Sequence, residues 1–586
     1  MRQFFKYVLA TLTGLVLFAG VGLLVLVLII AAAASSDKEV TVASNSVLEL
    51  TLDKPIGERE FTNPLSGFTG GQSSTIGLDE LKAAIRRAKG DNDIKGIFLN
   101  LELVQGGMAS MEEIRNELLD FKKAGKFIVS YTDAQSEKSY YLASVADKLY
   151  LNPQGTLEFN GLSSETMYYK NLFDKLGVQA QIFRVGSFKS AVEPFFRTSM
   201  SDSARLQTSS FLNSLNNSML AEVAAARKIT PARLKVISDS MLVHNADDAK
   251  RLGLVTDLGY YDQATDYIKG KLGVEKDEKL SLIELSDYKK SAGDDEGSTS
   301  GNRIAVVYAE GDIVTGKGGN ESIGSTRFAE AIRKARLDKN VKAVVLRVNS
   351  PGGSSLASDI IYREVMLTKK VKPIICSMSD VAASGGYFIA MGCDTIVAHP
   401  TTITGSIGVF GVLPNIEPFL RDKIGITTDR VTTGKFSDFP TVTRALTPFE
   451  QQQFQAEINR IYADFTTKAA AGRNMPVERL RRLASGRVWS GTEAKARGLV
   501  DVLGSMDDAL RIAARRAKLK EGDYRIQKLP RQKSFAENLF SSFSEEARLR
   551  MVKDEMGPMY PMYQQYKKLS EMKGAQMRMP FEVNVQ

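Results

Sequence analysis

The hydrophobic positions of the chain follow a helical spacing in some segments and form short β-branched runs in others. An amphipathic pattern over 79–90 (DELKAAIRRAKG) precedes the apolar run 94–102 (IKGIFLNLE), and a further apolar run follows at 126–133 (KFIVSYTD). Helical spacing buries one face of a helix, whereas runs rich in Val, Ile and Phe are typical of strands. Strands joined by helices at this interval predict parallel βαβ units with both faces of the sheet covered.

The same pattern occurs twice in the chain. Residues 83–102 (AAIRRAKGDNDIKGIFLNLE) match 330–349 (EAIRKARLDKNVKAVVLRVN), and residues 140–153 (YYLASVADKLYLNP) match 387–400 (YFIAMGCDTIVAHP). Both pairs are 247 residues apart, so one register is kept from the start of the first match to the end of the second. A repeat of this length predicts two copies of one α/β domain.

Segments that lack this pattern mark the boundaries of the two copies. The stretch 291–302 (SAGDDEGSTSGN) is rich in Gly, Ser and Asp, a composition typical of a linker. We therefore expect a first repeat over 41–290, a second repeat over 303–525 and a C-terminal tail over 526–586. The tail is rich in Met, Tyr and basic residues. It suits a membrane surface or a neighbouring subunit, but we favour a strap across its own domain.

The N-terminal segment contains the longest apolar run. Arg2 and Lys6 precede an uncharged stretch from 7 to 34. At 1.5 Å per residue in a helix, such a stretch is long enough for a hydrocarbon core of about 30 Å. The apolar region of a cleavable signal peptide is shorter, about 7–15 residues, although the run 31–34 (AAAA) resembles a small-residue cleavage site. We expect residues 1–40 to be an uncleaved single-span anchor, with a cytoplasmic N-terminus and the body outside, following the positive-inside rule.

The composition is that of a folded protein. Hydrophobic residues make up 43% of the chain and charged residues 25%, with a formal net charge of +9. No block of Lys and Arg, zinc-ligand spacing or aromatic-basic motif accompanies this charge, so we expect no nucleic-acid partner. Cys376 and Cys393 belong to no C-x-x-C pair; we expect buried free thiols, although an oxidising compartment would permit a bridge. The two histidines, His244 and His399, are expected to be structural.

Ser384 lies in a turn whose composition suits a nucleophile. It follows the run 372–380 (KPIICSMSD) within VAASGGYFIA (381–390), where small residues flank the serine and an apolar helix is expected next. A serine at a helix start is accessible to substrate, and the backbone N–H of Gly385 is then free to bind a developing oxyanion. An ordinary N-cap serine in a tight turn explains this local sequence equally well.

A second glycine-rich loop favours the catalytic interpretation. The strand-like run 341–348 (VKAVVLRV) leads into NSPGGSS (349–355), where Gly352 and Gly353 leave backbone N–H groups unobstructed. Loops at the carboxyl ends of neighbouring parallel strands share one crevice, so a glycine N–H here and that of Gly385 would form a two-donor oxyanion hole. A phosphate-binding loop is the competing interpretation, but the motifs G-x-G-x-x-G and G-x-x-x-x-G-K-[ST] are absent.

A nucleophilic serine needs a base, and Lys189 is the candidate. His244 and His399 lie outside the two loops, so a Ser-His-Asp triad is not expected. Lys189 follows the strand-like run 179–185 (QAQIFRV) within VGSFKSAVEPF (185–195). A lysine acts as a base only if burial or nearby positive charge lowers its pKa toward neutrality; a surface lysine is the ordinary alternative.

The repeat divides these two residues between the copies. At a separation of 247 residues Ser384 matches Glu137, and at a separation of 248 residues Lys189 matches Ser437. The first copy therefore keeps the lysine without the serine, and the second keeps the serine without the lysine. Duplication followed by complementary loss leaves one complete Ser-Lys dyad, which the two copies share.

These motifs resemble signal peptide peptidase A (SppA), in the long tandem form also called protease IV. The matching stretches are FKSAVEPFFR (188–197), RVNSPGGS (347–354), AASGGYFIA (382–390) and TGSIGVFG (404–411). The likeness covers nearly the whole chain after the N-terminal run and includes both repeats.

The resemblance implies a fold, an assembly and a site. The fold is the crotonase/Clp-protease superfold, and the assembly is a homo-oligomeric ring or dome, a tetramer, on the bacterial inner membrane with a periplasmic body. The nucleophile is then Ser384, the base Lys189, and the oxyanion donors Gly353 and Gly385, while Ser406 hydrogen-bonds the lysine and orients it.

The reaction that the resemblance implies is hydrolysis of remnant signal peptides through an acyl-enzyme, without a metal, a nucleotide or another cofactor. Two alternatives stay open. An acyl-CoA hydratase or isomerase uses the same superfold, but it needs no Ser-Lys pair and would find little coenzyme A outside the membrane. A non-catalytic membrane scaffold built on a dead duplicated fold would not need an intact dyad.

Overall fold

The computed structural model describes residues 2–35, 40–61, 74–291, 300–319, 321–520, 522–532 and 575–579. The expected linker 291–302 and the expected tail 526–586 therefore lie largely outside the described residues.

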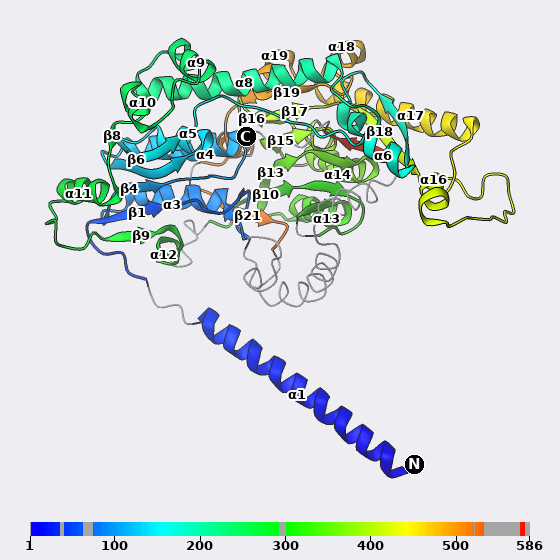
Figure 1. Cartoon of the computed structure of the whole chain (residues 1–586), viewed down its shortest axis with the longest axis horizontal. Coiled ribbons are helices and arrows are strands. Elements are labelled where there is room, and N and C mark those ends of the chain that lie inside the picture. Colours follow the sequence, from blue (N-terminus) through cyan, green and yellow to red (C-terminus); the bar gives the residue numbers. More distant parts are fainter. Residues whose placement is uncertain are drawn as a thin grey trace.

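One long helix, α1 (Arg2–Ser35), contains the N-terminal apolar run, and Figure 1 shows it extending away from the rest of the chain. The continuous helix predicted for 7–34 is confirmed. Among the helices of the described residues, none has both the length and the apolar character needed to cross a bilayer. The membrane span and its topology stay predictions.

The first repeat is built on a six-stranded sheet in which every neighbouring pair is parallel. In the order β8-β6-β5-β4-β1-β9, its strands are β8 (Asp257–Leu258), β6 (Lys148–Leu157), β5 (Phe127–Gln135), β4 (Ile94–Asn100), β1 (Ser46–Leu50) and β9 (Leu282–Glu284). The helices around it are α3 (Leu78–Gly90), α4 (Met108–Lys122), α5 (Glu137–Ala143), α10 (Ala246–Arg251), α11 (Tyr261–Leu272) and α12 (Leu285–Lys290). A short pair, β2 (Ile56–Gly57) and β3 (Ile76–Gly77), lies beside them. The predicted parallel βαβ architecture is confirmed.

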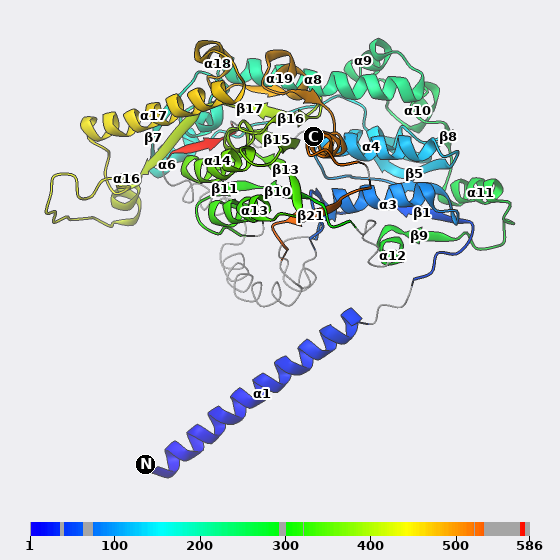
Figure 2. The same cartoon turned by 180° about the vertical axis from the view of Figure 1, so that it is seen from behind.

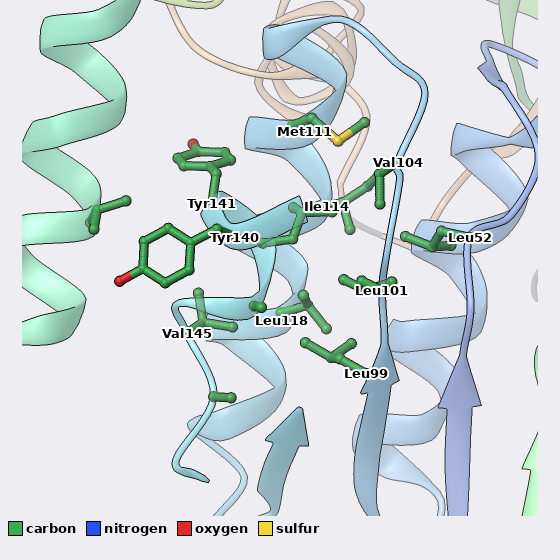
Figure 3. Close-up of a cluster of buried hydrophobic side chains, with 14 of the residues drawn as sticks. Leu52, Leu99, Leu101, Val104, Met111, Ile114, Leu118, Tyr140, Tyr141 and Val145 are labelled. Atoms are coloured by element: carbon green, nitrogen blue, oxygen red, sulfur yellow. The ribbon is translucent and has the colours of Figure 1, made fainter. Parts of the chain in front are cut away.

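The core of the first repeat forms where one face of α4 meets the sheet. Met111, Ile114 and Leu118 recur at intervals of three and four residues, which places them on one side of a helix. Figure 3 shows these side chains together with Leu99 of β4 and Tyr140 of α5. All five are buried, so this face of α4 belongs to the core of the first repeat.

The second repeat has the same architecture in an eight-stranded sheet. Along β19-β17-β15-β13-β10-β21 the strands are β19 (Val488–Ser490), β17 (Ile403–Gly405), β15 (Ile374–Ala383), β13 (Val341–Ser350), β10 (Arg303–Glu310) and β21 (Arg525–Leu529), and β16 (Thr395–Ala398) and β20 (Val502–Leu503) join beside β15. All pairs are parallel except β17 with β19. Its helices are α13 (Ser325–Leu337), α14 (Ser355–Lys369), α15 (Gly385–Ala390), α19 (Gly491–Arg497) and α20 (Met506–Arg516).

Matching elements of the two repeats begin at one constant separation. The helix pairs α3 and α13, and α4 and α14, and the strand pair β5 and β15 each start 247 residues apart. Side-chain contacts repeat as well: Tyr140 Oη donates to the carbonyl of Leu254 at 2.9 Å, and Tyr387 Oη donates to that of Leu499 at 3.0 Å. The predicted duplication is confirmed.

A third sheet joins the two repeats. In the order β12-β11-β14-β22-β18-β7, its strands are β12 (Ser322–Gly324), β11 (Asp312–Val314), β14 (Gly352–Ser354), β22 (Gln576–Arg578), β18 (Val409–Asn415) and β7 (Gln179–Val185). β7 belongs to the first repeat and pairs antiparallel with β18 of the second along its whole length. The two repeats therefore share a sheet.

Helices also cross between the repeats. Figures 1 and 2 show α8 (Asp202–Arg227) running along both of them, and it packs on β19 of the second repeat. The other helices near this boundary and beyond it are α6 (Lys170–Leu176), η1 (Ser190–Val192), α7 (Glu193–Phe196), α9 (Pro231–Asp239), α16 (Glu417–Phe419), η2 (Leu420–Ile424), α17 (Pro448–Gly472) and α18 (Val477–Leu483).

A buried ion network ties the strands of the second repeat to the first. Arg347 on β13 lies 2.7 Å from the carboxylate of Glu58 and 2.9 Å from that of Glu113, and only 1% of this arginine is exposed. It also donates to the hydroxyls of Ser377 and Ser379 on β15 at 2.9 and 3.0 Å. One guanidinium thus holds two strands of the second repeat against carboxylates of the first.

His399 extends this network. Its Nε2 lies 2.9 Å from Glu113, and its Nδ1 lies 3.3 Å from Glu112. Burial alone would lower the pKa of His399, but the two carboxylates outweigh burial and raise it to about 9. At Glu113, burial alone would raise the pKa, but Arg347 and Lys82 outweigh it and hold this pKa well below its usual range. The histidine is therefore charged at neutral pH and has a structural place in the fold.

Replacing Arg347 with Ala leaves the buried carboxylate of Glu58 without its cation and removes one of the cations around Glu113. Removing one partner of a buried pair typically costs about 3–5 kcal/mol, so we expect Arg347→Ala to lower the free energy of unfolding in urea by about that amount. Arg460→Ala is the control, because Arg460 pairs with Glu457 at the surface and such pairs contribute about 0–1 kcal/mol. Equal losses in the two variants would contradict this description of the network.

The raised pKa of His399 gives stability a pH dependence of defined sign. Because this pKa is about 9 in the folded chain and about 6.5 in an unfolded one, protonation stabilises the fold fully below about pH 6.5. The stabilisation is lost as pH rises through about 9. We expect the thermal unfolding midpoint of the native chain to fall over this window, and that of His399→Gln to fall less. Parallel pH curves for the two proteins would show that His399 carries no charge in the fold.

Candidate active site

Ser384 stands where β15 ends and α15 begins, at the carboxyl end of a parallel strand. Its backbone has φ 54° and ψ −112°, a region in which a non-glycine residue costs on the order of 1–3 kcal/mol. Its N–H donates to the carbonyl of Gly405, and its carbonyl accepts from the N–H of Phe388, both at 2.8 Å. A sharp strand-to-helix turn is also where some hydrolases carry their nucleophile. The ordinary N-cap explanation does not apply, because the Ser384 side chain caps no helix N–H.

Lys189 reaches this turn from the first repeat. β7 pairs with β18 and so carries the loop that follows it into the second repeat. In that loop the N–H of Phe188 donates to the carbonyl of Ser485 at 3.0 Å. Gln207 of α8 donates from Nε2 to the Phe188 carbonyl at 3.0 Å and to Ser190 Oγ at 2.9 Å. These bonds on either side of Lys189 fix where its side chain begins.

The side chains of Lys189 and Ser384 meet. Lys189 Nζ lies 2.8 Å from Ser384 Oγ, 3.0 Å from Ser406 Oγ and 3.2 Å from the Ser406 carbonyl oxygen. All three residues are completely buried. A general base must lie within about 2.6–3.2 Å of the group whose proton it removes, and the Nζ to Oγ distance meets this requirement.

Burial holds the pKa of Lys189 well below its ordinary value, because the charged amine loses its solvation. The oxygens around it are hydroxyl and carbonyl oxygens. Glu193, close in sequence, is engaged elsewhere: its carboxylate accepts from Ser201 at 2.6 and 3.0 Å and lies 3.7 Å from Arg184. A lysine in this position is neutral over a much wider pH range than a surface lysine.

Two glycines of the second repeat enclose the lysine. A Cβ atom on Gly486 would lie 2.7 Å from the Lys189 Cβ, and one on Gly408 would lie 3.2 Å from the Lys189 Cδ. The Gly408 carbonyl also lies 3.5 Å from Ser384 Oγ. Side chains at either position would displace the lysine, so this close approach depends on glycine.

The two loops predicted to supply oxyanion donors converge beside Ser384. A Cβ atom on Gly352 would lie 2.6 Å from the backbone nitrogen of Gly385, so the loop after β13 touches the start of α15. Gly352 and Gly353 have φ of 103° and 153°, values that favour glycine. Gly385 is the first residue of α15, and the N–H groups of a first helical turn have no partner within the helix.

The corresponding turn of the first repeat differs from the sequence alignment by one residue. Glu137, which aligns with Ser384, is the first residue of α5, and Ser136 takes the cap position. Ser136 has an ordinary φ of −74°, and its side chain accepts from the N–H of Ser139. The Glu137 carboxylate accepts from two backbone N–H groups at 3.2 and 2.9 Å; burial is the main cause that raises its pKa to about 7. In the first repeat, therefore, the serine at this turn is an ordinary helix cap without the backbone strain of Ser384.

Ser437, which aligns with Lys189, lies in an exposed turn, where its hydroxyl donates to a backbone carbonyl three residues earlier at 2.9 Å. The two copies correspond as far as Gly177 after α6 and Gly425 after η2, with φ of 77° and 79°. Beyond these glycines β7 pairs with β18, whereas 427–433 belongs to no sheet formed by the described residues. The copies diverge here because, within the described part of the chain, a partner strand is present for the first copy and absent for the second.

The sequence analysis did not identify three residues that contribute to this site. Gln207, Gly408 and Gly486 act through contacts with segments distant in the chain; Gln207, for example, also accepts from the N–H of Val488 at 3.3 Å. Gly408 lies within the TGSIGVFG motif, which is the single hint of its role. In the parts of the chain that the structure describes, no group of three His, Cys, Asp or Glu side chains is placed to hold a metal ion.

Fold and site together are those of a serine peptidase, a class in which lysine replaces histidine as the base in some members. The chain belongs to peptidase family S49, whose family model matches residues 120–275 and 366–520, one match in each repeat. Protease 4 of Salmonella typhi is 39% identical over 83% of this chain and 80% of that protein. The chloroplastic serine protease SPPA of Arabidopsis thaliana is 36% identical over 82% of this chain and 70% of that protein. The resemblance to the long tandem signal peptide peptidase A family is thereby confirmed.

Solved structures give a weaker match. A ClpP1 mutant from Listeria monocytogenes is 15% identical over 36% of this chain and 94% of its own, with a TM-score of 0.24. At this score the crotonase/Clp-protease superfold stays a prediction. The architecture that the structure itself defines is a tandem α/β fold with parallel sheets.

Gly486→Ala tests whether the enclosure of Lys189 matters. The added methyl group would strike the lysine, and a misplacement of about 1 Å at a catalytic group can cost about 100-fold in rate. We expect kcat for a fluorogenic peptide to fall at least about tenfold. Gly125→Ala is the matched control, because its φ of 78° equals that of Gly486 (79°) within a degree and no atom lies within 4 Å of the added carbon. Equal kcat values would show that the lysine tolerates displacement.

Proposed function

We propose that the chain is a membrane-anchored serine endopeptidase that cleaves remnant signal peptides and similar apolar peptides, with Ser384 as nucleophile and Lys189 as general base. The observation that carries the proposal is the 2.8 Å contact between Lys189 Nζ, completely buried, and Ser384 Oγ, on a strained turn. Membership of family S49 supports the reaction class. Neither a hydratase nor a non-catalytic scaffold accounts for this pair.

Catalysis begins with proton transfer. Neutral Lys189 removes the proton of the Ser384 hydroxyl while Oγ attacks the peptide carbonyl carbon. The peptide C–N bond then breaks as the lysine gives its proton to the leaving amine, and an acyl-enzyme forms. Water, deprotonated by the same lysine, hydrolyses the ester. Ser406 accepts a hydrogen bond from Lys189 and keeps the amine directed at Ser384.

Backbone N–H groups of Gly353 and Gly385 stabilise the tetrahedral oxyanion, and Gly352 lets their loops approach each other. Loss of a single oxyanion donor typically costs about 10²–10³ in kcat. Both donors are fixed by secondary structure, one in β14 and one at the start of α15, so little reorganisation is needed as charge develops.

A membrane anchor would place the peptidase near apolar peptides that remain in the bilayer. The apolar run 7–34 lies in α1, and Arg2 and Lys6 before it favour a cytoplasmic N-terminus with the body on the periplasmic face of the inner membrane. A putative signal peptide peptidase SppA of Enterococcus faecium is 34% identical over 39% of this chain and 67% of that protein. Peptides left in a bilayer are within reach of a peptidase held there.

We also propose that the chain forms a homo-oligomer, the tetramer that the resemblance to signal peptide peptidase A implies. The segment 427–433 follows Gly425 as β7 follows Gly177, and Val431 within it is fully exposed. β7 crosses to the next repeat of the same chain. By the same geometry 427–433 would cross to the first repeat of a second copy, and head-to-tail contacts of this kind form a ring when their rotation closes.

The lowered pKa of Lys189 gives the peptidase activity a pH dependence of defined sign. Only the neutral amine accepts a proton, so we expect kcat/KM to rise with pH through the lysine pKa and then level off. Lys189→Arg keeps a cation that cannot lose its proton in this range, so it should be as inactive as Lys189→Ala, at least about 10³-fold below native. Lys123→Arg, at an exposed position, is the control. A Lys189→Arg enzyme of native activity would remove the lysine from the mechanism.

A further inference from the structure

We propose that Arg184 is a positioning residue for the peptidase reaction: its guanidinium holds the backbone of Lys189 and keeps the buried carboxylate of Glu193 away from the lysine amine. The proposal rests on the function proposed above. It adds a residue that acts on the reaction through the general base.

The chain places a carboxylate where a salt bridge with the base is expected. Lys189 immediately precedes the helical turns η1 and α7, and Glu193 follows it by four residues. Side chains four apart on a helix are neighbours, and Lys and Glu at this spacing commonly pair. Such a pair would favour the charged amine and raise the pKa of Lys189 toward that of a surface lysine. A neutral base at this position therefore requires that the carboxylate is held elsewhere.

Arg184 and the start of α8 hold the Glu193 carboxylate. Arg184 Nη1 lies 3.7 Å from Glu193 Oε1, and the N–H and hydroxyl of Ser201 donate to the carboxylate at 3.0 and 2.6 Å. Only 1% of the Glu193 side chain is exposed, and a carboxylate is costly to bury without such partners. The amine of Lys189 meanwhile contacts hydroxyl and carbonyl oxygens. The two charges that the spacing would pair thus have separate partners.

The same guanidinium also holds the lysine backbone. Arg184 Nη1 donates to the Lys189 carbonyl oxygen at 3.3 Å. Arg184 lies on β7 opposite Phe410 of β18, so its main chain is fixed to the repeat that carries Ser384. Its guanidinium carbon lies 5.3 Å from the centre of the Phe196 ring, a distance typical of a cation–π contact. One side chain thus ties the base to a strand of the nucleophile's repeat.

Other titratable and charged groups lie near Glu193 on neighbouring elements. Tyr168 precedes α6; burial is the main cause that raises its pKa, and the charge of Glu193 raises it further, whereas Arg197 and Arg205 lower it. A phenol with a raised pKa stays neutral below about pH 10. Among the described residues, Arg184 is the cation that forms an ion pair with the Glu193 carboxylate. The charge balance around this carboxylate therefore depends on Arg184.

The pH dependence of kcat/KM in the full chain tests the proposal with three variants. Arg184→Met leaves a carboxylate near the base, which favours the charged amine, so we expect the rise of kcat/KM to move up by about 1 in pH. Glu193→Gln leaves a guanidinium there, which disfavours the charged amine, so the rise should move to lower pH. With both substitutions we expect the rise at its native pH. The kcat of the double variant should stay about tenfold low, because the Lys189 carbonyl has lost its donor.

Arg303→Met and Asp338→Asn are the matched controls. Arg303 pairs with Asp338 at 3.6 Å, and its side chain is 35% exposed, against 31% for Arg184. Arg303 begins β10, whereas Ser384 follows the carboxyl end of β15, so both controls should keep the native pH profile. Titration with a fluorophosphonate gives the concentration of active enzyme, so a partly unfolded fraction does not alter kcat.

The direction of the shifts decides the outcome. Shifts of one direction in both single variants, a native pH profile in both, or a double variant that keeps the shift of Arg184→Met would overturn the proposal. Glu193→Gln keeps an acceptor for Ser201, so its shift alone decides the matter if Arg184→Met does not fold. Failure of these shifts in a chain whose kcat/KM rises with pH contradicts the role of Arg184 alone. A native chain without peptidase activity would contradict the proposed function as well.

Discussion

The contact between Lys189 and Ser384 exists because two repeats of one chain together enclose the lysine. Removing an amine from water disfavours its charged form, and the partners that remain here are hydroxyl and carbonyl oxygens. A carboxylate at the position of Ser406 would restore the charge and raise the pKa again. The same burial that lowers the pKa of the lysine makes it costly to fold, so the lysine depends on close packing between the two repeats.

Several independent interactions hold that boundary. β7 joins a sheet of the second repeat, and Gln207 bonds the loop of Lys189 on one side and the N–H of Val488 on the other. Arg347 connects carboxylates of the first repeat to β13 and β15, the strands that lead to Gly352 and to Ser384. A buried ion network is weak evidence for stability in itself. Its position on these two strands indicates that it fixes how the catalytic loops face the lysine.

Features that depend on a local pattern or on the repeat were open to prediction from the sequence, whereas the contacts of ordinary residues with distant segments were not. The helical spacing over 79–90 and the strand over 179–185 are visible within one short segment each, and the constant separation of the repeats is visible by aligning the chain with itself. The meeting of Ser384 with Lys189 followed from complementary loss between the copies. Gln207 and Gly486 are ordinary residues in sequence, because their roles come from packing against segments that lie far away in the chain. The sequence alignment pairs Ser384 with Glu137, but the structure places Ser136 at the corresponding cap position. A helix start can shift by one residue without changing the hydrophobic pattern around it.

The proposed mechanism requires that one chain forms its own dyad from its two repeats. Ser384→Ala and Lys189→Ala chains, produced together with different affinity tags and isolated as mixed oligomers, test this most directly. Each such chain lacks one half of the pair, and a dyad formed within a chain is then incomplete everywhere. We expect the peptidase activity of the mixed oligomers to stay at the level of either variant alone. Activity restored in the mixed oligomers would show that the lysine of one chain serves the serine of another, and would contradict a dyad formed within one chain.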